Sequence, residues 1–352
     1  MLQGHFISMS FEDYTEMTAA LRENRDSGSF LFNIWCELRG FTAPLFFAIT
    51  GLVFTYLLTK NPCGPFWKQK RVQKGIKRGI SIMLWGYFLQ LNIKHIELYM
   101  TGEINSRFYA FHVLQCIGLG ILTLIFIYWI HTKIKRIPIE VSLLICGTLA
   151  IVLKPLIHSN GLPFFPSGAH EIIQNAFHGP NSVFPIFSSF GFILFGGAMG
   201  AFLNRFNHKI AESRFIIKMA SIGILICLAA HAIIFMIGSM YPQNPYLGKG
   251  YWNFDQLAWI IGVISSLMYI EQKTPFKIPF LIPIGQNTLV VYIIHVVLLY
   301  GAITGLGLKT YISKSLTFGE SIFGAVLFII FFVILTKLQP AIIKGVKHIL
   351  RN

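Results

Sequence analysis

Apolar segments of about twenty residues recur along almost the whole chain, and they constrain the fold more than any other feature. A hydrocarbon core of roughly 30 Å needs ~20 apolar residues per helix. A membrane β-barrel would alternate apolar and polar residues over strands of ~10 residues, whereas residues 143–153 are almost continuously apolar. With 54% hydrophobic and 12% charged residues, the chain has too little polar surface for a soluble protein. The sequence therefore predicts an all-α, polytopic transmembrane helix bundle.

The apolar segments predict about nine full helices, preceded by the end of a truncated first helix. The full helices are expected at residues 41–58, 80–98, 109–130, 139–157, 184–203, 216–240, 255–270, 284–303 and 319–337. Residues 1–9 are apolar but too short to span, and they lack the basic flank and cleavage site of a signal peptide. They are interpreted as the remnant of the first transmembrane helix, with Met1 an internal methionine. Residues 10–40 and 159–183 are expected to be outer loops, and residues 1–352 to form a single membrane-embedded domain.

The net charge of +15 is concentrated on one side of this predicted topology. Every second connection, together with the C-terminus, collects most of the lysines and arginines. The densest cluster is Lys60, Lys68, Lys70, Arg71, Lys74, Lys77 and Arg78. The positive-inside rule makes that side cytoplasmic, so we expect a cytoplasmic C-terminus in a bacterial cytoplasmic membrane. The basic residues thus indicate the lipid bilayer as a partner and not nucleic acid, while a homodimer is left open.

Several motifs of other enzyme classes are absent from the sequence. There is no GxxxxGK[ST] phosphate loop, no GxSxG elbow and no HExxH zinc motif. The five cysteines show neither a disulfide framework nor metal-ligand spacing. The sequence therefore predicts no metal site, and it disfavours nucleotide hydrolysis and zinc hydrolysis.

Polar residues inside the apolar segments are the candidates for function, because a charged group at the bilayer centre costs ~2.5 to 3.5 kcal/mol. His295 lies on one helical face with Tyr292 and Thr288. A neutral histidine that bonds a neighbouring helix is one interpretation, and a catalytic or substrate contact is the other. Arg39 could bind a phosphate or carboxylate in bidentate fashion, or could extend to the interface as an ordinary flanking cation.

Other candidates are weaker when taken alone. Gln115 lies deep in an apolar segment, where an amide needs a partner. Asp255 could bind a substrate or could stabilise a helix N-terminus. His231 is interpreted as a buried histidine that joins helices. The residues expected to bind substrate or acyl-CoA are Arg39, Gln115, Tyr292, Asn287, Glu37 and Asp255.

Five stretches of the sequence resemble integral-membrane acyltransferases of the heparan-alpha-glucosaminide N-acetyltransferase catalytic-domain family and, more distantly, of acyltransferase family 3. They are GHF at Gly4–Phe6, RGFTAPLFFAITGLVFTYLL at Arg39–Leu58, KRG at Lys77–Gly79, HVLQCIGL at His112–Leu119 and GQNTLVVYIIH at Gly285–His295. The D-x-x-R-G run that precedes the first of them in the family is absent here.

The resemblance implies acyl transfer from cytosolic acyl-CoA, usually acetyl-CoA, to a sugar or amino sugar on the extracytoplasmic side. It places a polar residue, often histidine, at the end of the first core helix, where His5 stands. Histidine titrates near working pH, so His5 is expected to be the catalytic base. Arg39, Gln115 and Tyr292 could hold CoA phosphates or the oxyanion, a contact worth ~3 to 4 kcal/mol per donor. His295 could orient one of these groups or the thioester.

Two other functions remain compatible with the sequence. A transporter or flippase of a small polar or lipid-linked substrate would also carry histidine and arginine inside the membrane. A membrane subunit without chemistry of its own would tolerate the loss of both His5 and His295.

Overall fold

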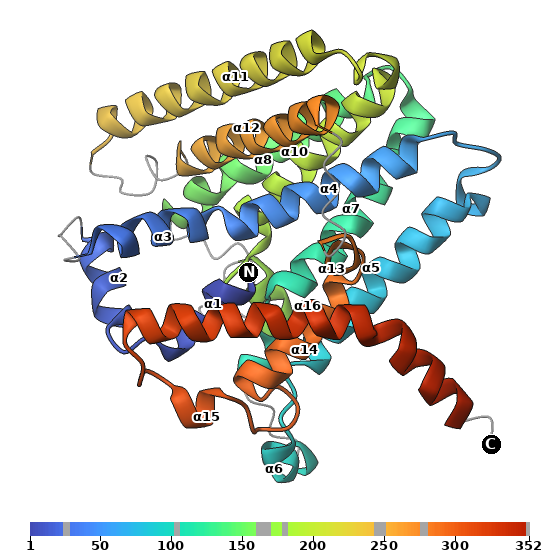
Figure 1. The fold of residues 1–352 in the computed structure, drawn as a ribbon. Helices are drawn as coiled ribbons and strands as arrows, with labels where there is room; N and C mark the ends of the chain where they lie inside the picture. Colours follow the sequence, from blue (N-terminus) through green and yellow to red (C-terminus); the bar gives the residue numbers. More distant parts are fainter. Residues whose placement is uncertain are drawn as a thin grey trace. The chain divides into compact units, whose positions relative to one another are not determined.

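The computed structural model describes residues 1–23, 29–101, 106–159, 170–177, 182–242, 251–274 and 281–349. Within these ranges the regular elements are α-helices and short 3-10 helices, and the only β pairing consists of two isolated bridges (Figure 1). The prediction of an all-α helix bundle is confirmed.

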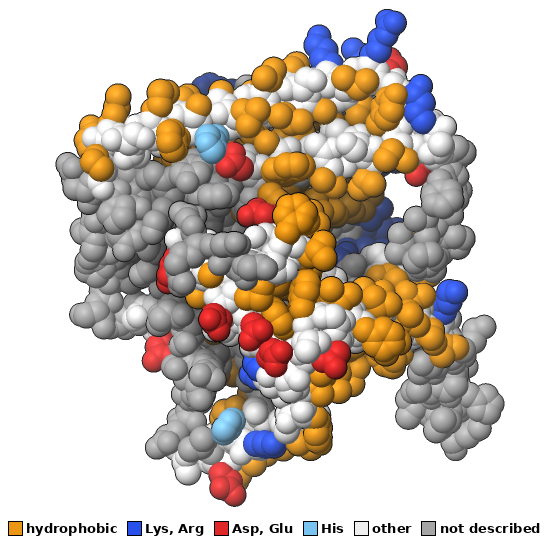
Figure 2. Space-filling model, turned by 60° about the vertical axis from the view of Figure 1, so that its left-hand side comes forward, with side chains coloured by type: hydrophobic (Ala, Val, Ile, Leu, Met, Phe, Trp, Pro, Cys, Tyr) orange, Lys and Arg blue, Asp and Glu red, His pale blue; other side chains and the backbone are white. Residues whose placement is uncertain are grey.

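Five helical stretches of the described chain are long and apolar enough to cross a membrane. They are Phe30–Thr59, Val113–Ile134, Ser213–Met240, Asn253–Lys273 and Phe318–Gln339. Ile139–Leu153 and Thr288–Tyr300 are shorter apolar helices. Helix α11 (Ser213–Met240) has exposed apolar side chains along most of its length. Figure 2 shows such side chains along the top of the view. Such a surface suits a lipid environment, and the chain is a membrane protein.

The described helices gather into two compact units, each built from separate pieces of the chain. The first unit comprises Met1–Gly40, Phe88–Ile104 and Phe276–Asn352, and the second comprises Phe41–Tyr87 and Asn105–Pro275. The expectation of a single domain over residues 1–352 stays a prediction.

The second unit contains α4 (Thr42–Thr59), most of α5 (Lys70–Phe88), α7 (Val113–Ile134), α8 (Ile139–Ser159), α9 (Glu171–Phe177), α10 (Ile186–Arg205), α11 and α12 (Tyr251–Lys273). Helix α10 packs against α4 and α8, and α11 packs against α12. Glycines allow α4 and α10 to touch through their backbones: a Cβ at Gly196 would overlap the backbone of Ala48, and one at Gly200 that of Leu52. Small residues permit such close approach between membrane helices.

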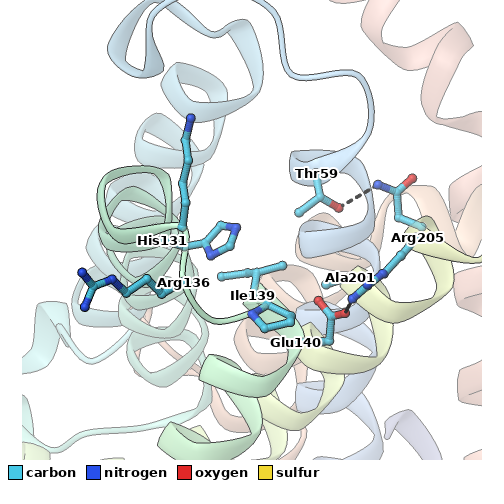
Figure 3. A pocket seen from close by; sticks show the side chains of 10 residues that line it. Thr59, His131, Arg136, Ile139, Glu140, Ala201 and Arg205 are labelled. Atoms are coloured by element: carbon cyan, nitrogen blue, oxygen red, sulfur yellow. Dashed lines mark hydrogen bonds and ion pairs between the residues drawn. The ribbon is translucent and has the colours of Figure 1, made fainter.

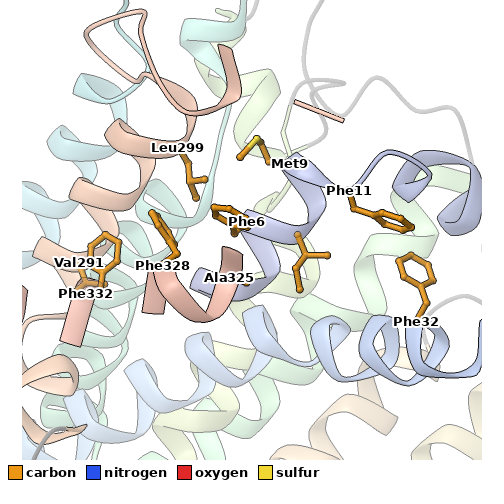
Figure 4. Packing of buried hydrophobic residues seen from close by; sticks show 10 residues of the cluster. Phe6, Met9, Phe11, Phe32, Val291, Leu299, Ala325, Phe328 and Phe332 are labelled. Atoms are coloured by element: carbon orange, nitrogen blue, oxygen red, sulfur yellow. The ribbon is translucent and has the colours of Figure 1, made fainter. Parts of the chain in front are cut away.

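The first unit contains α1 (Leu2–Ser10), α2 (Tyr14–Arg22), α3 (Phe30–Gly40), α6 (Ile96–Met100), α13 (Leu281–Gln286), α14 (Thr288–Tyr300), α15 (Lys309–Ile312) and α16 (Phe318–Ile349). Half of the buried residues of its core are phenylalanines (Figure 4). The buried residues are Phe6, Ile7, Met9, Phe11, Phe32, Val291, Leu299, Ala325, Phe328 and Phe332. Figure 4 shows Phe6 of α1 facing Phe328 of α16, with ring centroids 5.6 Å apart.

Backbone hydrogen bonds fix α1 against the chain that leads into α16. The amide of Lys314 donates to the carbonyl of Met9 at 3.0 Å, and the amide of Leu316 donates to Ser10 at 3.0 Å. The Ser10 hydroxyl, fully buried, donates to Ser321 Oγ at 3.0 Å. These bonds hold the end of α1 in a defined place.

Most predicted spans correspond to helices, but the prediction for residues 80–98 is wrong at both ends. Helix α5 begins at Lys70 and ends at Phe88. Its basic residues repeat at helical spacing while Val72, Gly75 and Gly79 are buried on another face, and an amphipathic helix of this kind is missed by a search for apolar runs. Beyond Phe88, the side chain of Asn92 accepts a hydrogen bond from the amide of Lys94 and caps a 3-10 turn.

The other corrections concern loops and one broken helix. Residues 10–40 were expected to be a loop but contain α2 and α3, because Tyr14, Met17 and Leu21 repeat at helical spacing and pack on the aromatic core. The span predicted at 284–303 is broken at Asn287 into α13 and α14. In the loop predicted at 159–183, residues 171–177 form α9, whereas residues 160–169 and 178–181 lie outside the described part.

Candidate active site

Two histidines far apart in the sequence lie side by side in the first unit. The ring centroids of His5, on α1, and His295, on α14, are 5.1 Å apart, with the rings tilted at 43°. His295 has no exposed surface, whereas His5 is partly exposed. Two imidazolium ions at this separation would repel each other, so the arrangement favours a state in which at least one ring is neutral.

The hydrogen bond of His295 defines its tautomer. Its Nδ1 lies 3.2 Å from the carbonyl oxygen of Val291, and a carbonyl can only accept. Nδ1 therefore carries the proton in the neutral ring, which leaves a lone pair on Nε2. Nε2 is buried and has no hydrogen-bond partner among the described residues. The Tyr292 ring meets the His295 ring edge to face at 4.9 Å.

Tyr300, the last residue of α14, joins His5 to that helix. Its hydroxyl lies 2.9 Å from His5 Nδ1, and the two rings meet edge to face with centroids 5.8 Å apart. Gly301 ends α14 in the left-handed conformation, which glycine adopts without strain. We refer to His5, Tyr292, His295 and Tyr300 as the histidine cluster.

Arg39, in the last turn of α3, lies against α1 beside His5. A Cβ at Gly4 would stand 3.4 Å from Arg39 Nε, so the small residue leaves room for the guanidinium side chain. Arg39 Nη1 donates a hydrogen bond to the hydroxyl of Tyr14. The guanidinium carbon lies 5.2 Å from the Tyr14 ring centroid and 5.5 Å from that of Trp35, within the range of cation–π attraction.

Lys314 is the second cation at Tyr14. Its Nζ lies 4.2 Å from the Tyr14 ring centroid and donates to the carbonyl of Ser8 at 3.0 Å. Burial and, secondly, the charge of Arg39 hold the pKa of the Lys314 ammonium below its usual value. We refer to Tyr14, Arg39 and Lys314 as the Tyr14 cation site.

The remaining candidates of the first unit lie elsewhere. Glu37 is exposed on α3, and residues two apart on a helix do not share a face, so it does not join Arg39 at Tyr14. The side chain of Asn287 donates to the carbonyl of Pro283 at 2.9 Å. Its amide therefore stabilises the break between α13 and α14.

Gln115 and Asp255 belong to the second unit. Gln115, on α7, is fully buried, and its amide packs on Gly86 of α5. Neither amide atom of Gln115 has a hydrogen-bond partner in the described part of the chain. Asp255 of α12 forms a hydrogen bond with His231 of α11, Oδ1 to Nδ1 2.6 Å. That pair joins α11 to α12, in keeping with the interpretation of His231 as a residue that connects helices.

Three residues of these clusters were missed from the sequence: Tyr14, Tyr300 and Lys314. Tyr14 and Lys314 lie in segments expected to be outer connections, and no periodic pattern marks Tyr300. One signal was available for Lys314, because a lysine on the predicted outer side runs against the positive-inside rule.

The second unit carries a pocket of about 390 Å³ among the ends of α4, α7, α8 and α10 (Figure 3). It is lined by Thr59, His131, Lys135, Arg136, Pro138, Ile139, Glu140, Ala201, Asn204 and Arg205. Asn204 donates to Thr59 at 3.1 Å in this pocket. Arg205 forms an ion pair with Glu140 at 2.6 Å, and Figure 3 shows these two side chains together. In the second of these contacts, the charge of Glu140 balances that of Arg205.

Metal-ligating side chains do not gather in the described ranges: no group of three or more His, Cys, Asp or Glu is placed to hold an ion there. The chemistry available to the histidine cluster is proton transfer and hydrogen bonding. Its histidines, phenols and neighbouring cations are the groups that general base catalysis of acyl transfer uses.

The chain matches the family model of acyltransferase family 3, described as an acyltransferase domain, over residues 5–337. It belongs to this family, and the class of protein is therefore a membrane acyltransferase. No curated protein and no solved structure is detectably similar to the chain. The narrower likeness to the heparan-alpha-glucosaminide N-acetyltransferase family stays a prediction.

Proposed function

We propose that the protein transfers an acetyl or other short acyl group from cytosolic acyl-CoA to a hydroxyl or amino group of a sugar on the extracytoplasmic side. The observation that carries this proposal is the contact between His5 and His295, 290 positions apart in the sequence and 5.1 Å apart between ring centroids. The family supplies the reaction class, and the histidine cluster supplies groups suited to it.

His5 is the catalytic base in this proposal. It is the partly exposed member of the pair, and an acceptor must reach the base directly. With Nδ1–H donating to the oxygen of Tyr300, Nε2 is free to accept a proton. Tyr300 then stabilises the imidazolium that forms, as the third group does in other base-activated acyl transfers.

The proposed reaction is a direct transfer of the acyl group from the thioester to the acceptor. The acceptor oxygen or nitrogen forms a bond to the thioester carbonyl carbon while His5 Nε2 removes its proton. The carbon–sulfur bond then breaks, and the thiolate of CoA receives that proton from His5. The products are the acylated acceptor and free CoA, and His5 returns to its neutral form.

His295 is assigned a positioning role, because it has no exposed surface. Its neutral ring, fixed by the Val291 carbonyl, presents the Nε2 lone pair inside the cluster. A neutral neighbour tolerates a protonated His5 better than a second cation would. Tyr292 is assigned the contact to the developing oxyanion, and Arg39 the contact to an anionic group of a substrate.

The test is thiol release from acetyl-CoA by the purified protein, with a mixture of sugars and amino sugars, both neutral and anionic, as acceptor. We expect release to depend on acceptor and to fall at least about 10²-fold in His5→Ala, the range in which a general base contributes. His208→Ala is the matched control, because His208 is exposed in a 3-10 turn of the second unit. Equal release by His5→Ala and the unchanged protein would refute the assignment of His5.

The positioning role of His295 needs a different readout. His295→Gln keeps a side chain that can donate to the Val291 carbonyl, whereas His295→Ala removes that side-chain donor. We expect His295→Ala to lower kcat and shift the pH profile of thiol release, with partial recovery in His295→Gln. An unchanged pH profile in both variants would contradict this role.

A further inference from the structure

We propose that the acyl acceptor carries an anionic group, a carboxylate or a phosphate, and that the Tyr14 cation site binds it beside His5. This inference rests on the proposed function and adds the chemical class of the acceptor. It is carried by the contacts of Arg39 and Lys314, by the conformation of Lys314 and by the position of both cations.

The hydrogen-bonding capacity of Arg39 is largely unused. A guanidinium offers five N–H donors, and within the described residues only the Tyr14 hydroxyl accepts one of them. The side chain is partly buried between α1 and the Tyr14 and Trp35 rings, so its solvation is reduced. A planar fork with free donors fits a carboxylate or phosphate in bidentate fashion.

Two cations share Tyr14 without a neutralising carboxylate. In the part of the chain that the structure describes, neither Arg39 nor Lys314 forms an ion pair with Asp or Glu. Their mutual repulsion contributes, after burial, to the lowered pKa of the Lys314 ammonium. Like charges held together in a partly buried site are unfavourable, and an anion between or beside them would remove that cost.

The backbone at Lys314 supports a role for its side chain. Its φ is 54°, in the left-handed region where a residue other than glycine is strained. The amide of Lys314 donates to Met9, and Nζ donates to Ser8. Glycine could make the first bond without strain, so the lysine at this position is explained by its ammonium. Strain of this kind is concentrated at functional sites.

The site is placed for the acceptor and not for the donor. Arg39 packs at Gly4, the residue before His5, so an anion on its guanidinium lies next to the proposed base. In the predicted topology, Arg39 and Lys314 both lie on the outer side, opposite the basic cytoplasmic connections. Acyl-CoA arrives from the cytoplasm, whereas the acceptor arrives from outside.

The experiment measures ligand binding to the purified full chain in the absence of acyl-CoA. The probes are glucuronate, glucose 6-phosphate and glucose, which share one ring and differ in charge. We expect one or both anionic sugars to bind at least tenfold more tightly than glucose, with affinity that falls as salt increases. The tighter of the two identifies the anionic group as carboxylate or phosphate. Equal affinity for all three sugars would overturn the proposal.

Substitutions locate the site. Lys314→Gln and Arg39→Gln should each reduce the affinity for the anionic sugar at least tenfold, whereas Lys314→Arg should retain most of it. Lys309→Gln is the matched control, because Lys309 is an exposed cation five residues earlier in the same unit. If Lys309→Gln weakens binding as much as Lys314→Gln, the effect is one of general charge and the proposed site is wrong.

A competition experiment separates the acceptor from the donor. Adenosine 3′,5′-bisphosphate carries the phosphate chemistry of CoA without its thioester. We expect it to leave binding of the anionic sugar unchanged, and full competition would overturn the assignment to the acceptor. The proposed function is tested by thiol release and this inference by binding without acyl-CoA, so either one can fail alone.

Discussion

The α4–α10 contact in the second unit and the Tyr14 cation site in the first unit follow opposite rules. At the α4–α10 contact, glycines bring two helix backbones together and leave no room for a side chain. At the Tyr14 cation site, two cations lack a carboxylate partner in the described chain, and Lys314 has a strained backbone. Proteins depart from local consistency mainly where function requires it. The first arrangement is that of a scaffold, and the second is that of a site.

The largest effect, a loss of stability, is expected from adding a side chain at the α4–α10 contact. The Cβ of Gly196→Ala would overlap the Ala48 backbone, and overpacking of this kind costs ~1 to 3 kcal/mol; because backbone cannot rotate away, we expect the upper end. Gly262→Ala is the control, since its Cβ would meet only Ile224 Cδ1, at 3.9 Å. Thermal unfolding in detergent should show a large decrease for the first variant and none for the second. Equal stability of the two would contradict the scaffold assignment.

A smaller but more informative effect is expected at Gly324 on α16. A Cβ there would stand 2.5 Å from the Phe6 ring, and Phe6 adjoins His5. Gly324→Ala should cost about 2 kcal/mol of stability and should also lower acyl transfer, because the shifted ring displaces α1. Gly319→Ala, which meets nothing within 4 Å, is the control for helix α16. The measurement is thiol release per folded protein. If Gly324→Ala and Gly319→Ala were both as active as the unchanged chain, packing at Gly324 would not affect acyl transfer.

The pH dependence of anion binding tests the second half of the comparison. Lys314 is charged below its pKa, and that pKa is lowered by burial and then by Arg39. Attraction to an anionic sugar should therefore be full below the lowered pKa of Lys314, at pH values where the sugar keeps its negative charge, and should decline as pH rises through that pKa. The arginine of Lys314→Arg stays charged throughout. Its affinity should remain level across the pH range in which the unchanged protein loses about tenfold, and parallel curves would rule out Lys314 as the titrating group.

The smallest effect is expected at the helix-end pocket of the second unit. The side chain of Arg205 is 57% exposed and that of Glu140 13% exposed in their ion pair, and a pair with an exposed partner contributes ~0 to 1 kcal/mol. Arg205→Gln should lower stability by less than 1 kcal/mol and leave binding of anionic sugars unchanged. A loss of anion affinity in this variant would show that the Tyr14 cation site is not the place of binding.

The sequence predicted the helical membrane class and the two histidines because these depend on local patterns. Apolar runs define α4, α7 and α11 to within a few residues. The prediction from sequence failed at α5, because the buried face of this helix consists of glycines and only a few apolar residues. A small buried residue leaves no hydropathy signal.

The candidate site was predicted only in part, because its assembly is not local. His5 and His295 were identified as polar residues in apolar segments, but nothing in one sequence indicates that Tyr300 reaches His5 Nδ1. Tyr14 and Lys314 were hidden in segments expected to be loops. Asn287 and Asp255 are predicted from the sequence to bind substrate. In the structure, Asn287 forms a hydrogen bond with Pro283, and Asp255 forms one with His231.

The pairing of residues 9–12 with residues 314–316 sets the order in which the site can form. A ribosome makes His5 about three hundred residues before Lys314, at ~5 to 20 residues per second. Until residues 314–316 have been made, α1 lacks the backbone segment that holds it. It also lacks the aromatic rings of α16 that cover it. The candidate site becomes complete only when α16 has been made and has packed on α1, so an unfinished chain does not yet hold His5 in its place beside His295.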